Sequence, residues 1–182
     1  LSNVNMASKD AKFYQEAKYE LGRAYVKVGD ETKARDVFNQ ILAIENSSFA
    51  AQSLIELGMI ERNRNNADKA IAYYKRVVEQ MPMSEYADDA LLAIESIYQS
   101  KNEPETYLAY IESIGKSSLK TEDEREQMIF NAAEQIFLSG DYAKALASLQ
   151  NYETKYPNGV LLSKAHFYTA ESYKQLGNLE SA

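Results

Sequence analysis

The 182-residue sequence contains no cysteine and no tryptophan. The lack of cysteine excludes a disulfide framework and any cysteine-based zinc or redox chemistry. Glycine and proline are scarce, at seven and three residues, which argues against a disordered or linker-rich chain. Hydrophobic residues make up 45% of the sequence, enough for a folded core. The composition therefore indicates a folded chain of about one ordinary domain in length.

The sequence also lacks an apolar run long enough to span a membrane, and its first residues do not resemble a signal peptide. The formal net charge is −7, whereas nucleic-acid phosphates call for a basic surface. We expect no membrane insertion by this segment and no nucleic-acid partner.

One turn position recurs along the chain at steps of 36 to 38 residues and always holds glycine or asparagine. The five occupants are Gly29, Asn65, Asn102, Gly140 and Gly177. Both residue types enter the left-handed backbone region at low cost, as the end of a helix often requires. The next residue is Asp, Asn or Glu, and Asp and Asn are strong N-caps. A repeat period in this range indicates a stacked array of short structural units.

The stretch from Ala51 to Ser84 predicts one helical hairpin around such a turn. Its second half carries apolar residues at spacings of three and four, which place them on one helix face. Small residues recur seven positions before the turn and five positions after it, as in Gly58 and Ala70. We interpret this pair as facing each other across the hairpin, so that the two backbones approach closely.

These features together resemble the tetratricopeptide repeat: Leu-Gly, a following Tyr, an Ala, an aromatic residue and a closing proline at Pro82 and Pro157. The resemblance covers nearly the whole chain and is weakest in the third unit. It implies an all-α fold, a right-handed superhelical solenoid of stacked antiparallel helix pairs. We expect a single array over residues 1–182, a piece of a longer protein whose last unit is incomplete. The expected units are 8–48, 49–83, 84–120, 121–159 and 160–182.

The third unit departs from the pattern, because Glu95 and Tyr107 stand where the other units have small residues. A polar segment at 115–120 also makes its exit longer than the other joins. We expect its helices to splay, or the register to shift toward Ala109, and any bend of the array to lie here.

Helix starts are marked by two further signals. Thr121 and Glu124 fit a capping box for the first helix of the fourth unit. Ser84 is the predicted N-cap for the third unit. In the first unit we expect helices at 9–28 and 31–45.

The joins between units carry a second resemblance. The join from Met81 to Ala87, with the order Met-Pro-Met-Ser-Glu-Tyr-Ala, is similar to those of bacterial cell-envelope repeat proteins. That group includes outer-membrane assembly lipoproteins and TolA-binding coordinators. The resemblance implies a periplasmic or outer-membrane-associated location, although the residues themselves leave the compartment open.

The family resemblance implies that a partner binds the concave face, which the first helices line. The first-helix residues expected on this groove form an apolar and aromatic row with charges at its edges, suited to a peptide. They are Tyr19, Arg23, Ile55, Met59, Arg62, Leu92, Phe130, Glu134, Phe137, Phe167, Glu171 and Lys174. The alternative is that the apolar members Ile55, Leu92, Phe130 and Phe167 pack between neighbouring units. The carboxylate clamp of the chaperone-binding subset is disfavoured, because its places hold Tyr19, Glu56, Asp89 and Ala93.

Other candidate sites have structural interpretations. We expect His166, the sole histidine, to be a partly buried core residue rather than a catalyst. The carboxylates of Glu122, Asp123, Glu124 and Glu126 are interpreted as a solvated helix start, with metal binding as the alternative. No phosphate-binding glycine loop is present, and no cofactor is expected.

Three classes of function follow from these observations. The leading hypothesis is a non-catalytic protein-interaction scaffold with a protein or peptide partner. The alternative is a glycan-binding helical-repeat protein of the cell envelope, which would need two or more tyrosines exposed together on one face. An enzyme would need a deep cleft with two close carboxylates whose pKa values are shifted in opposite directions.

Overall fold

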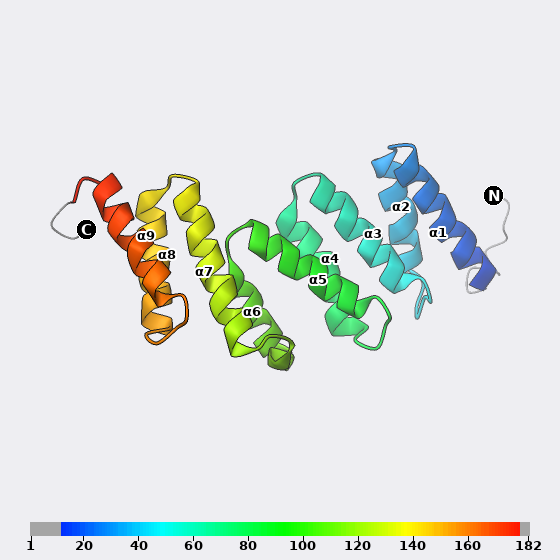
Figure 1. The fold of residues 1–182 in the computed structure, drawn as a ribbon. Coiled ribbons are helices and arrows are strands. Elements are labelled where there is room, and N and C mark those ends of the chain that lie inside the picture. The colour runs from blue at the N-terminus through cyan, green and yellow to red at the C-terminus, as the bar shows by residue number, and fades with distance from the viewer. Residues whose placement is uncertain (1–11, 179–182) are drawn as a thin grey trace. The chain divides into compact units, whose positions relative to one another are not determined.

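The computed structural model describes residues 12–178, which form helices and turns without any strand (Figure 1). The chain divides into two compact units, one ending at Ile94 and the other beginning at Glu95. The helices that begin in the first unit are α1 (Lys12–Lys27), α2 (Glu31–Leu42), α3 (Ala50–Asn63), α4 (Ala67–Gln80) and α5 (Ala87–Ser100). Those of the second are α6 (Pro104–Ser113), the 3-10 helix η2 (Ser117–Leu119), α7 (Glu122–Leu138), α8 (Tyr142–Lys155) and α9 (Leu162–Gln175). The boundary between the units falls inside α5.

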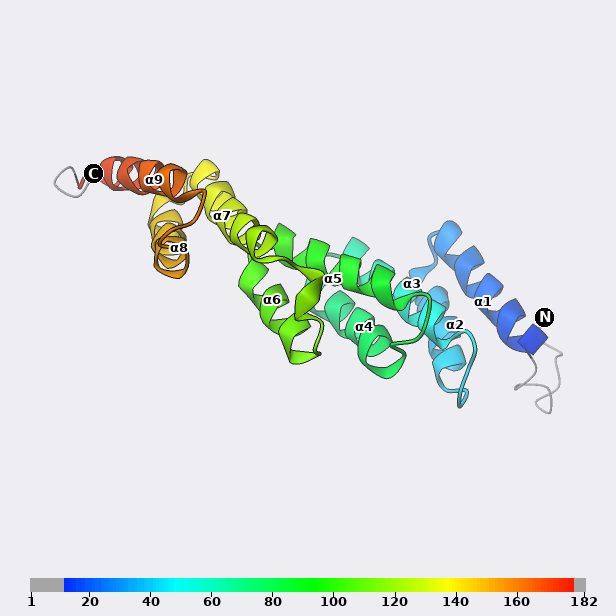
Figure 2. The same ribbon diagram turned by 60° about the horizontal axis from the view of Figure 1, so that its bottom comes forward.

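Successive helices run antiparallel and pack in pairs within each unit (Figures 1 and 2). In the first unit α1 packs on α2, α2 on α3 and α3 on α4. In the second unit α6 contacts α7, α7 packs on α8, and α8 on α9. The predicted all-α fold of stacked helix pairs is therefore confirmed, while the hand of a superhelix stays a prediction.

The five turn residues all have positive φ, as the repeat pattern predicts. Their φ angles are 78° at Gly29, 59° at Asn65, 55° at Asn102, 84° at Gly140 and 79° at Gly177. The left-handed residue ends the first helix at each of the five turns, and in the four pairs whose second helix is described it directs the chain into that helix.

The residue after the turn caps the second helix where it is Asp. Asp30 and Asp141 accept hydrogen bonds from the backbone N–H groups of Lys33 and Lys144, each at 3.1 Å. The predicted capping box of Thr121 with Glu124 is also present. The prediction of Ser84 as an N-cap is wrong, because α5 begins three residues later at Ala87. The Ser84 hydroxyl instead accepts a hydrogen bond from the Tyr86 N–H at 3.2 Å, within the join.

The expected end of one helix differs from the structure. The sequence predicts that the second helix of the first repeat reaches residue 45. In the structure α2 ends at Leu42, and Asn46 has a positive φ of 53°. The expected helix start at Lys9 lies outside the described residues, and so does Ala182, which holds the small-residue position five residues after Gly177.

Each glycine in the small-residue position makes room for an aromatic ring of the second helix. A Cβ added to Gly22 would lie 2.5 Å from the ring of Phe38, and one added to Gly58 would contact the ring of Tyr74. The interpretation that Gly58 faces Ala70 is therefore wrong, because the atoms nearest to a Cβ at Gly58 all belong to the Tyr74 ring. The fourth repeat has the combination Ala133 with Leu149 at the same two places. A larger residue on one helix thus accompanies a smaller residue on the other.

The first two helix pairs share one core. Ala34, Phe38 and Ile41 of α2 are fully buried and pack with Leu57 and Ile60 of α3. Burying these side chains stabilises the fold by about 1.5–3 kcal/mol per large residue relative to an exposed position. This cluster joins one pair to the next, so neither pair has its full core alone.

Buried polar side chains hold two joins in place from equivalent helix positions, seven residues before the small residue. The Gln15 side-chain oxygen accepts from the Ser48 N–H at 3.1 Å and from the Ser47 hydroxyl at 2.9 Å. Glu126 accepts from the Tyr152 hydroxyl at 2.6 Å and from the Leu161 N–H at 3.1 Å. Glu126 therefore does not belong to the solvated carboxylate cluster expected at 122–126.

The third repeat keeps its register despite its unusual residues. Tyr107 is 2% exposed whereas Ala109 is exposed, so the expected shift toward Ala109 is wrong. Glu95 is tolerated in a small-residue position because Lys120 Nζ lies 2.8 Å from its carboxylate. Burial and this neighbouring carboxylate raise the pKa of the Tyr107 hydroxyl.

The contact between Gly58 and Tyr74 gives a testable prediction. Gly58→Ala should destabilise the protein by about 1–3 kcal/mol, because the buried Tyr74 ring cannot move away from the new methyl group. Gly58→Ala combined with Tyr74→Leu reproduces the residue pair of the fourth repeat. The double variant should therefore lose less unfolding free energy than the sum of the losses in the two single variants. Urea unfolding of all four proteins measures the coupling. Strictly additive effects would contradict this account of the hairpin.

Candidate functional site on the first helices

The expected groove residues of the first unit lie on α1, α3 and α5. Met59 and Leu92 are 49% and 63% exposed, and both lie in the middle of their helices. Arg62 is also exposed, whereas Tyr19 and Ile55 are half-buried. The accessible apolar surface of this set therefore comes mainly from Met59 and Leu92.

Tyr19 and Arg23 connect α1 to α3 through Glu56. The Tyr19 hydroxyl donates to Glu56 Oε1 at 3.2 Å, and Arg23 Nε lies 3.7 Å from the same oxygen. The Tyr19 ring packs on Phe38 and Phe49, with centroid separations of 5.9 and 5.5 Å. Burial and the Glu56 carboxylate raise the pKa of the Tyr19 hydroxyl. Tyr19 is thus a packing residue, with the partly exposed Arg23 beside it.

In the second unit the structure separates Phe130 from the other expected groove residues. Phe130 is fully buried, with its ring 5.5 Å from that of Tyr152, so it cannot contact a partner. Its assignment to the groove is wrong, because Tyr152 of α8 and Tyr168 of α9 both pack against the ring. Phe137 is half-buried, whereas Phe167 on α9 is 63% exposed.

A polar cluster joins α7 to α9 at the position that Arg23 and Glu56 occupy in the first unit. Glu134 lies 2.7 Å from Lys164 Nζ and accepts from the Tyr168 hydroxyl at 2.8 Å. The bond from Lys164 is the main reason that the pKa of Glu134 is lowered. Neither Lys164 nor Tyr168 was expected here. The signal for Tyr168 is its place in the repeat, which equals that of Glu56.

Aromatic rings surround this cluster and hold it in place. The Tyr168 ring lies 4.6 Å from that of Phe137 and 5.5 Å from that of Phe167. Lys164 Nζ also lies 5.2 Å from the centroid of Phe130. Glu171 and Lys174, the last two expected groove residues, form an ion pair at 3.3 Å on α9.

The structure also places the other candidate residues of the sequence. His166 is exposed, so its interpretation as a partly buried core residue is wrong. Among residues 12–178 no group of three or more His, Cys, Asp or Glu side chains could hold a metal ion. No helix in that range is both long and apolar enough to cross a membrane. All fourteen tyrosines are at least partly buried. The glycan-binding alternative required two or more tyrosines exposed together on one face, and the structure does not show such a group among them.

Comparison with known proteins identifies the repeat. Two family models, both described as tetratricopeptide repeat, match residues 19–90 and 127–159. Together they span more than half of the chain. No curated protein matches it. A solved structure of MamA (AMB-1) is similar at 16% identity, with 92% of this chain and 85% of that chain covered and a TM-score of 0.41.

The Glu134 cluster predicts a pH dependence of stability. Because the folded-state pKa of Glu134 lies below its ordinary value of 4.5, its contribution is complete above pH 4.5 and is lost as the pH falls further. Glu134→Gln should therefore show a smaller loss of unfolding free energy than the parent between neutral pH and about pH 3.5. Urea unfolding at several pH values measures this difference. The control Glu79→Gln, at an exposed site on α4, should keep the parent's pH dependence. An unchanged pH dependence in Glu134→Gln would refute the cluster's role.

Proposed function

We propose that this tetratricopeptide repeat protein is a non-catalytic scaffold that holds a partner protein or peptide against the exposed first-helix surfaces within its two units. The match to tetratricopeptide repeats supports the general role, since such repeats are protein-interaction modules. The choice of face rests on one observation about exposed apolar side chains.

That observation is where large apolar residues remain exposed among residues 12–178. Most of them lie in turns, in joins or at helix ends, as Val28, Met83 and Val160 do. The three that lie in the middle of a helix are Met59, Leu92 and Phe167. All three belong to first helices, on α3, α5 and α9. Exposed apolar groups on rigid helices are suitable anchors for a partner.

Charged residues accompany these anchors in each unit. Arg62 follows Met59 on the same helix, and Lys174 lies two turns beyond Phe167. An apolar centre with a polar edge is the usual arrangement of a protein interface. The clusters around Glu56 and Glu134 also restrict nearby side chains before a partner arrives. Such restriction lowers the entropy lost on binding, which favours affinity without a conformational change.

The joins between repeats support a cellular location, which we add to the proposal. Ser47 and Ser84 each accept a hydrogen bond from the N–H two residues later, at 3.2 Å, just before α3 and α5. This Ser-x-aromatic-Ala join resembles that of bacterial cell-envelope repeat proteins. A periplasmic or outer-membrane-associated partner is the corresponding expectation, and fractionation of cells that express the full parent protein tests it.

The proposed face is tested by removing its three exposed apolar side chains. The triple variant Met59→Ser, Leu92→Ser and Phe167→Ser should lose the proteins that the parent captures from cell extract, because the anchors are gone. Its circular dichroism should stay close to the parent's, since all three side chains are largely exposed.

The matched control is Val28→Ser, Met83→Ser and Val160→Ser, which removes three residues that are 75%, 95% and 85% exposed in turns and joins. The control should retain the captured proteins, as identified by mass spectrometry. Equal capture by the first-helix variant and the parent would refute the proposed face.

A further inference from the structure

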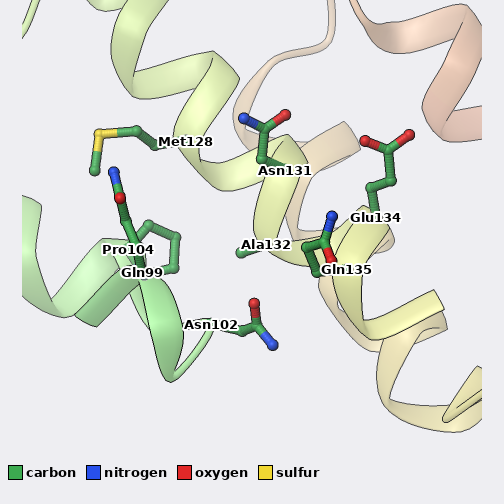
Figure 3. A pocket seen from close by; sticks show the side chains of 8 residues that line it. All are labelled: Gln99, Asn102, Pro104, Met128, Asn131, Ala132, Glu134 and Gln135. Carbon is green, nitrogen blue, oxygen red and sulfur yellow. The ribbon is translucent and has the colours of Figure 1, made fainter. Parts of the chain in front are cut away.

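A hollow of about 460 Å³ lies in the second unit between α7 and the turn that leads into α6 (Figure 3). Side-chain amides surround it: Gln99 and Asn102 from one side, Asn131 and Gln135 from α7. Figure 3 shows the short Ala132 side chain in the space that faces Pro104 at the start of α6. The hollow is thus a polar, amide-rich space between the third and fourth repeats.

The hollow exists because two packing residues of the second and third repeats are replaced in α7. Ala132 holds the position of Leu57 and Ile94, which are both fully buried. Gln135 is exposed and holds the position of Ile60, which is 3% exposed. A leucine and an isoleucine here would fill the junction as they do in α3. The chain instead has a small residue and a polar residue, which leave the space open to solvent.

The electrostatics of the hollow favour an uncharged ligand. Glu134 is the one carboxylate that lines it, and Lys164 already pairs with this group at 2.7 Å. Nearby Glu95 is likewise paired, with Lys120 at 2.8 Å. A cationic ligand would compete with these ion pairs, and an anionic ligand would meet no cation among the lining residues.

The amides offer both donors and acceptors. The Gln99 side-chain NH₂ group donates to Glu95 at 3.1 Å, so its carbonyl oxygen is available to accept from a ligand. Asn131 uses its oxygen to accept from Gln127 at 2.6 Å, which leaves its NH₂ group. Asn102 and Gln135 form no side-chain hydrogen bond with the rest of residues 12–178, so each offers a donor and an acceptor. A peptide main chain carries the same pair of groups in every residue.

We propose that this hollow binds an extended, uncharged peptide segment, whose main-chain groups pair with the amides while a small side chain contacts Met128 and Pro104. The lining contains no aromatic ring on which a sugar could stack, so a peptide fits better than a glycan. The inference deepens the proposed function, because it names a chemistry for a partner segment and a separate place where it binds.

The test uses a blocked hexapeptide of alternating alanine and serine, which carries no charge. In heteronuclear NMR spectra of the full chain, the side-chain NH₂ signals of Asn102, Asn131 and Gln135 should shift as the peptide is added at millimolar concentration. Peptides that alternate alanine with lysine or with glutamate should shift them less. An equal or larger response to maltotriose would overturn the peptide assignment, as would the absence of any shift.

Two variants separate binding from packing. Ala132→Leu with Gln135→Ile fills the hollow with the residues of α3, so peptide shifts should disappear while the melting temperature rises or stays level. Asn131→Ala should weaken binding about fivefold, because it removes one hydrogen-bonding group without filling the space. Ala147→Leu, at an exposed alanine on α8, is the control and should bind like the parent. Undiminished shifts in both hollow variants would overturn the inference.

The result is separable from that of the proposed face. The variant Met59→Ser, Leu92→Ser and Phe167→Ser should bind the hexapeptide like the parent, because none of its sites lines the hollow. If that variant loses protein capture while the parent ignores the peptide, the present inference fails and the proposed face stands.

Discussion

The contact between a glycine on the first helix and an aromatic ring on the second sets the geometry of the first two helix pairs. At Gly22 and Gly58 the rings of Phe38 and Tyr74 occupy the space that a side chain would need. Interiors are packed too densely for such a contact to be loosened freely. It fixes the separation of the helices, and thereby which residues of α2 reach Leu57 and Ile60 of the next pair. The stacking within this unit follows from that separation.

Polar side chains perform the complementary task of fixing how one repeat joins the next. Gln15 and Glu126 hold equivalent positions on the first helix of their repeats. Each accepts a hydrogen bond from the join that follows the second helix of the same repeat. Because a buried polar group is costly unless it is bonded, the join has one favourable arrangement at each place. A protein that binds by displaying a preformed face benefits from such joins, since little ordering remains to be done on binding.

The repeat pattern predicted the features that depend on local backbone chemistry. The left-handed turns at Asn65 and Gly140 and the capping box at Thr121 are local, so residue type was sufficient. Burial on the first helices was harder to predict, because periodicity identifies a helix face but not what covers it. Phe130 and Phe167 hold the same repeat position, yet one is fully buried and the other is 63% exposed. The bond between Glu134 and Lys164 depends on the spacing of two repeats, which no single sequence pattern encodes.

The central claim is that a helix pair is stable here only when a neighbouring pair covers its apolar face. Short helices alone are marginal in water, and repeat units gain much of their stability from the interfaces between them. Circular dichroism of two fragments tests this most directly: residues 49–83, which hold α3 and α4, and residues 12–94, which hold the first unit. The longer fragment should be helical and unfold cooperatively on heating, whereas the shorter should show little helix. A cooperative transition of residues 49–83 at the same temperature would contradict the claim.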